Sequence, residues 1–250
     1  MSMKKTVLIT GGTLGIGHAT AELLLERGFH VIILARDAAR LAEVQAAFVA
    51  GGHSAADIET ANVDMGDADA IARVVPKLKL LQDGLFGLVN NAAAEILRKI
   101  TDYTREDLET TWRVNMRGPV LMIQACYPFL KKASGSVVNV GSISDRDHYE
   151  TYSVYGGSKS FLNEFSQHAA KELGFDGVRI NVVSPGGVDT PLMRQIEKQF
   201  SPSDIEKAKK NVPIGQRWGT SREIAEAILF CLTGPQYLHG ADIRVHGGSA

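Results

Sequence analysis

Apolar runs of strand length alternate with helical periodicity along the whole chain, and this alternation most constrains the fold. Continuous apolar strands separated by helices are typical of a parallel sheet that is covered by helices on both faces. We therefore predict an α/β fold: a single doubly wound domain over residues 1–250, with a central parallel sheet of about seven strands. The predicted strands are 6–10, 31–35, 58–63, 85–90, 136–141, 178–184 and 242–245, and the main predicted helices are 15–27, 38–50, 105–131 and 153–173.

Charge and cysteine content exclude several classes of protein. The formal net charge is −1 and the pI is about 6.7, which argues against a nucleic-acid partner held by bulk charge. Cys126 and Cys231 form neither a disulfide framework nor a zinc signature, and the histidines and carboxylates never fall at metal-ligand spacing. The apolar run near the N-terminus is much too short for a signal or membrane helix. We expect a soluble, cytoplasmic protein without a metal.

The first predicted strand runs directly into a glycine-rich turn that opens the first predicted helix. Residues 10–17 read TGGTLGIG, which places Gly11, Gly15 and Gly17 in a Gly-x-x-x-Gly-x-Gly spacing. Glycines let the backbone turn tightly and approach a pyrophosphate, which a helix N-terminus also favours electrostatically. The spacing differs from the Gly-x-Gly-x-x-Gly fingerprint, and a glycine-rich turn alone is weak evidence. Its position between strand and helix favours dinucleotide binding.

Ser142, Tyr155 and Lys159 are the side chains best suited to chemistry. Ser142 directly follows the predicted strand 136–141, and Tyr155 and Lys159 stand four residues apart on the predicted helix 153–173. Residues four apart share one helix face, so a hydroxyl, a phenol and an ammonium can meet in one small volume. Such a trio suits proton transfer at a carbonyl or alcohol oxygen. Taken alone, however, Tyr-x-x-x-Lys is far more often a half-buried tyrosine beside a solvated lysine.

The tyrosine needs a suitable pKa if it is to act as a general acid and base. Free tyrosine titrates near pH 10, which is too high for a base at neutral pH. A positive charge at about 4 Å contributes roughly 4 kcal/mol at an effective dielectric of 20. Because about 1.4 kcal/mol corresponds to one pH unit, Lys159 is predicted to lower the pKa of the Tyr155 phenol by about 3.

The order and spacing of these motifs resemble one family, the short-chain dehydrogenases/reductases in their compact form of about 250 residues. The resemblance covers the whole chain and implies a Rossmann-type fold. It also implies an oxidoreductase that uses NADP or NAD to interconvert a carbonyl and a secondary alcohol by hydride transfer. Residues 90–93 resemble the family's Asn-Asn-Ala-Gly motif, with Ala93 in place of the usual glycine, and residues 185–190 resemble its Pro-Gly-x-x-x-Thr motif.

The resemblance assigns a role to each catalytic residue. It implies that Tyr155 moves the proton on oxygen, Ser142 orients that oxygen, and Lys159 lowers the phenol's pKa and binds the nicotinamide ribose. Asn115 would complete a proton relay through water. The predicted cofactor-binding residues are Gly11, Thr13, Leu14, Gly15, Ile16, Gly17, Arg36, Asp64, Met65, Asn91, Ala92, Tyr155, Lys159, Pro185, Gly186, Val188 and Thr190.

The end of the second predicted strand favours NADP(H) over NAD(H). An acidic side chain there would accept a hydrogen bond from the ribose 2′-hydroxyl and repel a 2′-phosphate. This chain instead has Ala35 followed by Arg36, whose guanidinium matches a phosphate in charge and in forked geometry. Against this, Leu14 stands where many NADP-preferring relatives carry a basic residue. Asp37 is acidic, but it is better interpreted as the N-cap of the next helix.

Two further features predict how the protein assembles and gates its site. Residues 185–216 form a long, loop-rich connection, so we predict a mobile substrate lid over about 191–211, with a short charged helix that begins near Ser201. The long helices at 105–131 and 153–173 carry more apolar positions than one sheet face needs. They predict a homo-oligomer, a tetramer or else a dimer.

The substrate and the direction of the reaction are not determined by the sequence. The residues expected to face a small-molecule substrate are Ala94, Glu95, 144–152, Gly187 and 192–200. The polar segment 145–149 indicates either a polar substrate or a solvated loop. A non-catalytic dinucleotide sensor on the same fold is the alternative function. A nucleotide-sugar epimerase or dehydratase would need another glycine spacing and a larger C-terminal domain.

Overall fold

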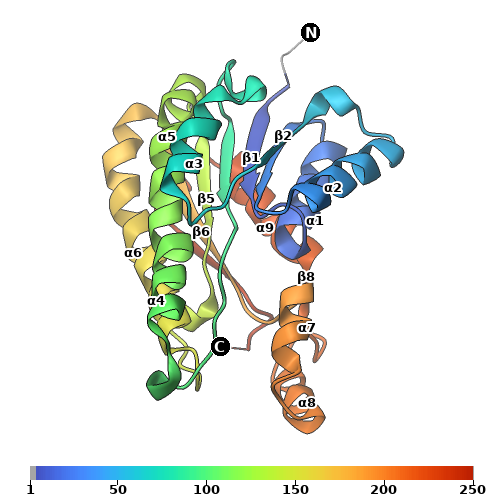
Figure 1. Cartoon of the computed structure of the whole chain (residues 1–250), viewed down its shortest axis with the longest axis vertical. Helices are drawn as coiled ribbons and strands as arrows, with labels where there is room; N and C mark the ends of the chain where they lie inside the picture. The colour runs from blue at the N-terminus through green and yellow to red at the C-terminus, as the bar shows by residue number, and fades with distance from the viewer. Residues whose placement is uncertain (1–3, 250) are drawn as a thin grey trace.

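The main sheet of the computed structural model has seven parallel strands in the order β3-β2-β1-β4-β5-β6-β9 (Figure 1). The structure describes residues 4–249, so residues 1–3 and 250 of the predicted domain lie outside the described residues. The seven-stranded parallel prediction is confirmed, and the predicted bounds agree to within two residues. The strands are β1 (Thr6–Thr10), β2 (His30–Ala35), β3 (Ile58–Asn62), β4 (Gly87–Asn90), β5 (Ser136–Val140), β6 (Arg179–Pro185) and β9 (Asp242–Val245).

Helices cover both faces of this sheet because side chains of each strand point alternately to either side. Leu8 of β1 packs in a core with α3 (Ala68–Val74), α5 (Gly118–Ala133) and α6 (Ser153–Leu173). Its neighbours Val7 and Ile9 pack in a second core on the opposite face. The helices of that face are α1 (Gly15–Glu26), α2 (Ala38–Ala50) and α9 (Ser221–Thr233) (Figure 1).

The long helix predicted at 105–131 is wrong in one respect: it is interrupted. α4 (Arg105–Thr111) passes through a π-helical segment, Trp112–Arg117, before α5 begins. The physical reason lies at Pro119, which has no N–H to donate to the carbonyl of Asn115, four residues earlier. A wider turn accommodates this missing bond, and π-helical turns of this kind are often found at functional sites.

The connection predicted to be loop-rich is also more ordered than expected. It contains α7 (Pro191–Glu197) and α8 (Pro202–Lys210), which extend beyond the sheet in Figure 1. Each helix begins with a hydroxyl cap followed by proline: Thr190 accepts from Met193 N at 3.1 Å, and Ser201 accepts from Asp204 N at 3.2 Å. A short pair of parallel strands, β7 (Val188–Asp189) and β8 (Gly219–Thr220), closes the connection at its base.

The remaining local features are the cap of α9, the two cysteines and the length and polarity of the helices. Thr220 and Glu223 form a capping box at the start of α9. Cys126 and Cys231 are buried and unpaired, and they lie in different cores. Within residues 4–249, every helix is too short or too polar to cross a membrane.

Candidate active site

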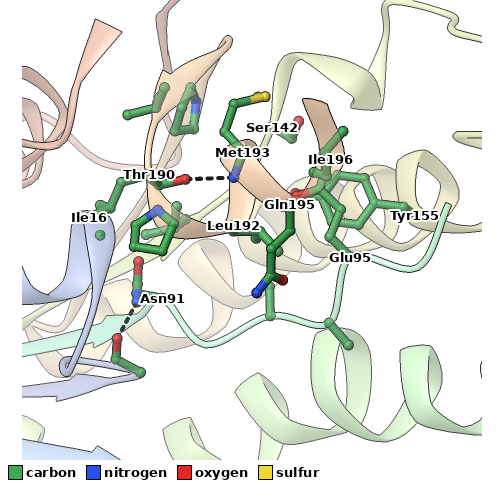
Figure 2. Close-up of a pocket in the computed structure, with 18 of the residues that line it drawn as sticks. Ile16, Asn91, Glu95, Ser142, Tyr155, Thr190, Leu192, Met193, Gln195 and Ile196 are labelled. Carbon is green, nitrogen blue, oxygen red and sulfur yellow. Dashed lines mark hydrogen bonds between the residues drawn. The ribbon is translucent and has the colours of Figure 1, made fainter. Parts of the chain in front are cut away.

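The candidate site is a cleft of about 1000 Å³ at the carboxyl ends of the strands. β1 and β4 are neighbours in the sheet, yet the chain continues from them in opposite directions, toward β3 and toward β9. Such a switch point leaves a crevice in which α/β proteins bind their ligands. The walls come from the turn after β1, the segment after β4, the ends of β5 and β6, and the helices α7 and α8 (Figure 2).

Most of the predicted cofactor-binding residues line this cleft together. Gly17 is the exception, because it packs beneath the turn and does not face the cleft. The predicted residues that do line it are Gly11, Thr13, Leu14, Gly15, Ile16, Arg36, Asp64, Met65, Asn91, Ala92, Tyr155, Lys159, Pro185, Gly186, Val188 and Thr190.

The backbone of the glycine turn explains why glycine is needed at each of its positions. Gly11 has φ +67° and Gly15 has φ +53°, values that other residues rarely adopt. A Cβ at Gly17 would lie 2.4 Å from the carbonyl oxygen of Gly11 and 2.6 Å from Nδ2 of Asn91. The turn therefore presents a bare backbone at the N-terminus of α1, which is the cradle that a pyrophosphate requires.

Asn91 holds this turn against the end of β4. Its Nδ2 donates to the carbonyl oxygens of Thr10 at 3.0 Å and Gly11 at 3.1 Å. In return, Thr10 Oγ1 accepts from the backbone N–H groups of Asn91 at 3.0 Å and Ala92 at 3.1 Å. The two strand ends at the switch point are thereby locked in register before any ligand binds.

After the end of β2, Asp37 is the N-cap of the next helix, as the sequence indicated. The Asp37 carboxylate caps α2, where it accepts from Arg40 N at 3.0 Å. Arg36 lines the cleft, and among residues 4–249 no hydrogen bond or ion pair engages its guanidinium. The acidic side chain is therefore occupied at the helix start, whereas the guanidinium remains available to a phosphate.

Ser142, Tyr155 and Lys159 line the same cleft, from the end of β5 and the start of α6. Tyr155 and Lys159 are both buried. The Lys159 ammonium donates to the carbonyl oxygen of Val140 at 2.7 Å and lies 5.6 Å from the centre of the Tyr155 ring. Ser142 Oγ accepts from the N–H and the hydroxyl of Ser144, at 3.2 and 2.9 Å.

The predicted lowering of the Tyr155 pKa is not what the structure shows. Burial raises the pKa of the Tyr155 phenol well above 10, and the nearby carboxylate of Glu95 and phenol of Tyr152 raise it further. The hydroxyl of Ser142 acts in the opposite direction. The simple charge argument omitted the desolvation of a buried phenolate, which is the largest influence on this pKa, and it relied on Lys159, which is not among the groups that shift it.

Burial also perturbs Lys159 and its acidic neighbour. It lowers the pKa of the Lys159 ammonium to about 8, although Glu95 acts to raise it. It raises the pKa of the Glu95 carboxyl to about 7, although Lys159 acts to lower it. Two coupled, strongly perturbed groups in a cleft are typical of a functional site.

Asn115 lies behind the wall of the cleft and does not line it. Its side chain belongs to the π-helical segment and binds both polar backbone groups of Ala94, accepting from N at 2.7 Å and donating to O at 2.8 Å. Its Nδ2 also donates to Ser158 Oγ at 3.0 Å. Asn115 thus ties α6 to the segment that follows β4.

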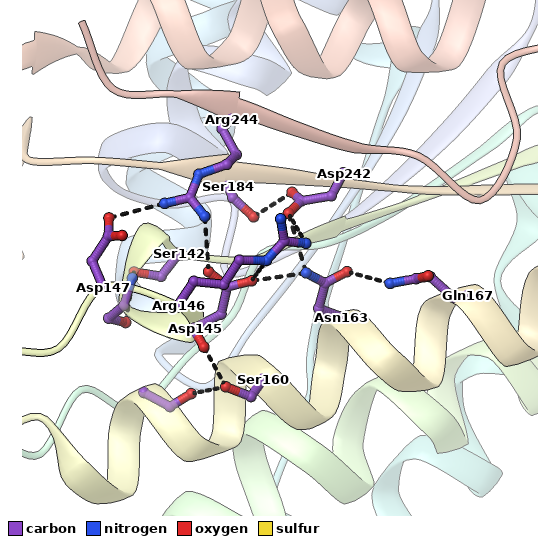
Figure 3. A network of polar contacts seen from close by, with 12 residues as sticks. Ser142, Asp145, Arg146, Asp147, Ser160, Asn163, Gln167, Ser184, Asp242 and Arg244 are labelled. Carbon is purple, nitrogen blue, oxygen red and sulfur yellow. Dashed lines mark hydrogen bonds and ion pairs between the residues drawn. The ribbon is translucent and has the colours of Figure 1, made fainter. Parts of the chain in front are cut away.

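In the polar segment 145–149, Arg146, His148 and Tyr149 are exposed, whereas Asp145 and Asp147 are held by other parts of the protein. Asp145 is buried, and its carboxylate accepts from Asn163 Nδ2 at 2.8 Å (Figure 3). Arg244 of β9 donates to Asp147 at 2.9 Å, and Arg146 donates to Asp242 at 3.2 Å. These contacts fasten the turn that carries Ser142 to the last strand of the sheet.

The substrate wall combines predicted residues with others that sequence reasoning missed. Of the predicted set, Ala94, Glu95, Ser144, Tyr149, Glu150, Tyr152, Gly187, Leu192, Met193, Gln195, Ile196, Glu197 and Phe200 line the cleft. Trp218 and Ser249 line it as well and were missed. The signal for Trp218 was the adjacent pair Gly186–Gly187, because a Cβ at Gly187 would lie 2.3 Å from the Trp218 ring.

Comparison with known proteins identifies the family. The chain belongs to the short chain dehydrogenase family, whose model matches residues 5–200. An uncharacterized oxidoreductase of Staphylococcus epidermidis is 30% identical over 97% of this chain and 96% of its own length. The solved structure of ElxO with NADP bound has a TM-score of 0.88 at 26% identity, covering 99% of both chains. A 3-oxoacyl (acyl-carrier-protein) reductase from Agrobacterium tumefaciens with NADP bound has a TM-score of 0.87 at 28% identity, covering 98% and 93%.

These comparisons confirm the family resemblance that the motifs indicated. The protein is accordingly an oxidoreductase of the short-chain type, which acts on CH–OH or C=O groups.

Proposed function

We propose that this protein interconverts a carbonyl and a secondary alcohol, with NADP(H) as the preferred cofactor and Tyr155 as general acid and base. The observation that carries the proposal is the convergence of Ser142, Tyr155 and Lys159 in the same cleft as the glycine turn. A dinucleotide would be held by that turn, by Arg36 and by the strand ends, and it would supply or accept the hydride.

The proton chemistry follows from the arrangement of the side chains. Because burial keeps the Tyr155 phenol protonated at neutral pH, it can donate its proton to a carbonyl oxygen during reduction. Ser142 Oγ already accepts two bonds from Ser144, so its own hydrogen is directed toward Tyr155, whose pKa it acts to lower, and would serve a substrate oxygen bound there. Ser144 is therefore a positioning residue for Ser142.

Lys159 and Asn115 position the groups around Tyr155 and Ser142. The Val140 carbonyl positions the Lys159 ammonium, which would bind the ribose hydroxyls of a dinucleotide. Asn115 fixes the Ala94 backbone that forms the adjacent wall. In the proposal it also takes part in a water-mediated proton relay from Lys159.

The decisive experiment compares wild type with Tyr155→Phe on a panel of ketones, diketones and acyl thioesters. Removing the phenolic proton is expected to lower turnover by at least about a hundredfold, the usual size of a general acid–base contribution. Binding of NADPH, followed by its fluorescence, should remain. Dinucleotide binding without turnover of any panel member by the wild type would contradict the enzymatic proposal and favour a sensor.

The preference for NADP(H) rests on Arg36 and on the capping role of Asp37. Bound NADP in two similar solved structures supports this choice. We expect the wild-type kcat/KM to be higher with NADPH than with NADH, and Arg36→Ala to remove that preference while sparing NADH. Wild-type preference for NADH, or an unchanged preference in Arg36→Ala, would show that another group selects the cofactor.

A further inference from the structure

Glu95 is a carboxylate that lines the cleft and that the proposed mechanism leaves unused. It lies on the segment after β4 and is close enough to Tyr155, Tyr152 and Lys159 to act electrostatically on all three. Figure 2 shows Glu95 next to Tyr155 on the same wall. A substrate whose reacting oxygen contacts Tyr155 would therefore place its next atoms beside this carboxylate.

Within residues 4–249, the Glu95 carboxylate has no partner of its own. Among the residues that the structure describes, none donates a hydrogen bond to it and none forms an ion pair with it within 4.0 Å. The nearby Lys159 donates to the Val140 carbonyl instead. Removing a carboxylate from water without a hydrogen bond or a counter-ion is costly, as the raised pKa of Glu95 reflects.

The position of Glu95 is nevertheless held on both sides. Its predecessor Ala94 is bound through both backbone polar groups by Asn115. Its successor Ile96 accepts at its carbonyl oxygen from the hydroxyl of Tyr103, at 2.9 Å. Such preorganisation by neighbouring residues is what a recognition group requires.

A row of three aromatic rings begins beside the carboxylate, since Glu95 acts on Tyr155 and Tyr152. Tyr149 and Tyr152 have ring centres 5.4 Å apart, and Tyr152 and Tyr155 have ring centres 6.0 Å apart. All three line the cleft. The faces of aromatic rings attract cations, and clusters of rings recognise ammonium groups.

The charges of the cleft also favour a cationic group beside Glu95. Its basic side chains, within residues 4–249, are Lys159 and the pair Arg36 and Arg40 at the glycine-turn end. Lys159 is committed to the reacting centre, so an anionic substrate group beside Glu95 would meet repulsion. A positively charged nitrogen would instead meet a carboxylate and aromatic rings.

We propose that Glu95, together with Tyr149 and Tyr152, forms a subsite for a positively charged nitrogen, so that the substrates are amino ketones and the corresponding amino alcohols. This inference rests on the proposed carbonyl–alcohol activity. It extends that activity by specifying the substrate class.

The test uses pairs of ketones that differ only by charge. In the first pair, 1,1-dimethyl-4-oxopiperidinium is compared with 4,4-dimethylcyclohexanone, in which carbon replaces the charged nitrogen. In the second, 4-(trimethylammonio)acetophenone is compared with 4-tert-butylacetophenone, which places the charge farther from the carbonyl. The kcat/KM of each ketone with NADPH is measured at pH 8 for wild type and for Glu95→Gln.

In at least one pair we expect Glu95→Gln to lower kcat/KM for the charged ketone by at least tenfold. The charged-to-neutral ratio of kcat/KM should also fall by at least tenfold, because both ketones share any effect of the variant on Tyr155 and Lys159 and the ratio cancels that effect. Glu109→Gln, which removes an exposed carboxylate on α4, should leave both values unchanged. A charged-to-neutral ratio that is the same in wild type and Glu95→Gln for both pairs would overturn the subsite.

A binding measurement keeps this inference separate from the proposed function. Calorimetry with the alcohol 4-hydroxy-1,1-dimethylpiperidinium, which needs no turnover, is expected to show at least tenfold weaker binding to Glu95→Gln than to wild type. The same comparison with Glu95→Met, a second uncharged replacement, guards against a folding defect in one variant. If no ketone is reduced but this binding difference holds, the proposed reaction fails and the cation subsite stands. If neutral ketones are reduced and the charge makes no difference, only the subsite fails.

Discussion

Glu95→Gln removes a half-buried charge but keeps the shape of the side chain, so its effect on stability should depend on pH. Burial raises the pKa of the Glu95 carboxyl from 4.5 to about 7 in the folded protein. Between these values the unfolded chain releases its proton, whereas the folded protein retains it. The wild type therefore loses stability as the pH rises through this window, and below pH 4.5 the penalty is absent.

The size of the effect follows from the width of that window. Each pH unit over which only the unfolded chain is ionised costs about 1.4 kcal/mol, so about 2.5 pH units give about 3.5 kcal/mol. Removing this cost stabilises the variant, but the variant also loses a favourable contact. Glu95 raises the pKa of the Lys159 ammonium, which burial lowers to about 8, so Glu95→Gln makes that ammonium less stable. We therefore expect Glu95→Gln to gain about 2 kcal/mol over wild type between pH 5 and pH 8, or about 4–8 °C in Tm.

Thermal unfolding of both proteins at pH 5 and pH 8, at equal protein concentration, measures this difference. Glu109→Gln serves as the exposed control and should give the same Tm offset from wild type at both pH values. If the offset of Glu95→Gln is also the same at both pH values, or is smaller at pH 8, then burial of charge at Glu95 does not cost stability. An active site that retains a destabilising carboxylate is consistent with a functional role for it.

Three further predictions concern the structure around the site. Asn115→Ala should lower Tm by about 6–12 °C, because it removes three hydrogen bonds of about 1 kcal/mol each, whereas Asn62→Ala, with one exposed bond, should have little effect. Hydrogen exchange should show residues 191–211 opening readily in the free protein and becoming protected when NADPH and a ketone bind; equal protection in both states would exclude a gating role. Light scattering at micromolar concentration should give a dimer or tetramer. Trp112 exposes 46% of its surface beside the stacked rings of Phe161 and Phe165, and a second copy of the chain would cover this apolar surface. A 27.0 kDa particle would contradict self-association.

The sequence by itself determined the layered sheet and the local geometry of the ligand-binding turn. Apolar runs of four to seven residues, such as β1, can be buried on both faces only within a parallel sheet covered by helices. Residues such as Gly11 and Gly15 signal backbone conformations that other residues rarely adopt. The caps at Thr190 and Thr220 are likewise encoded within four residues. These features are local, so pattern and spacing suffice to predict them.

Only the tertiary structure decided what surrounds the catalytic groups. Glu95 and Tyr155 are separated by about 60 positions, yet they become neighbours because β4 and β5 are paired. Burial of both groups, and the effect of Glu95 on Tyr155, set pKa values that spacing alone misjudged. The side chain of Asp145 faces inward because Asn163 of α6 and Arg244 of β9 contact it. Solvation and charge depend on everything that packs around a group, and a linear pattern records only its neighbours along the chain.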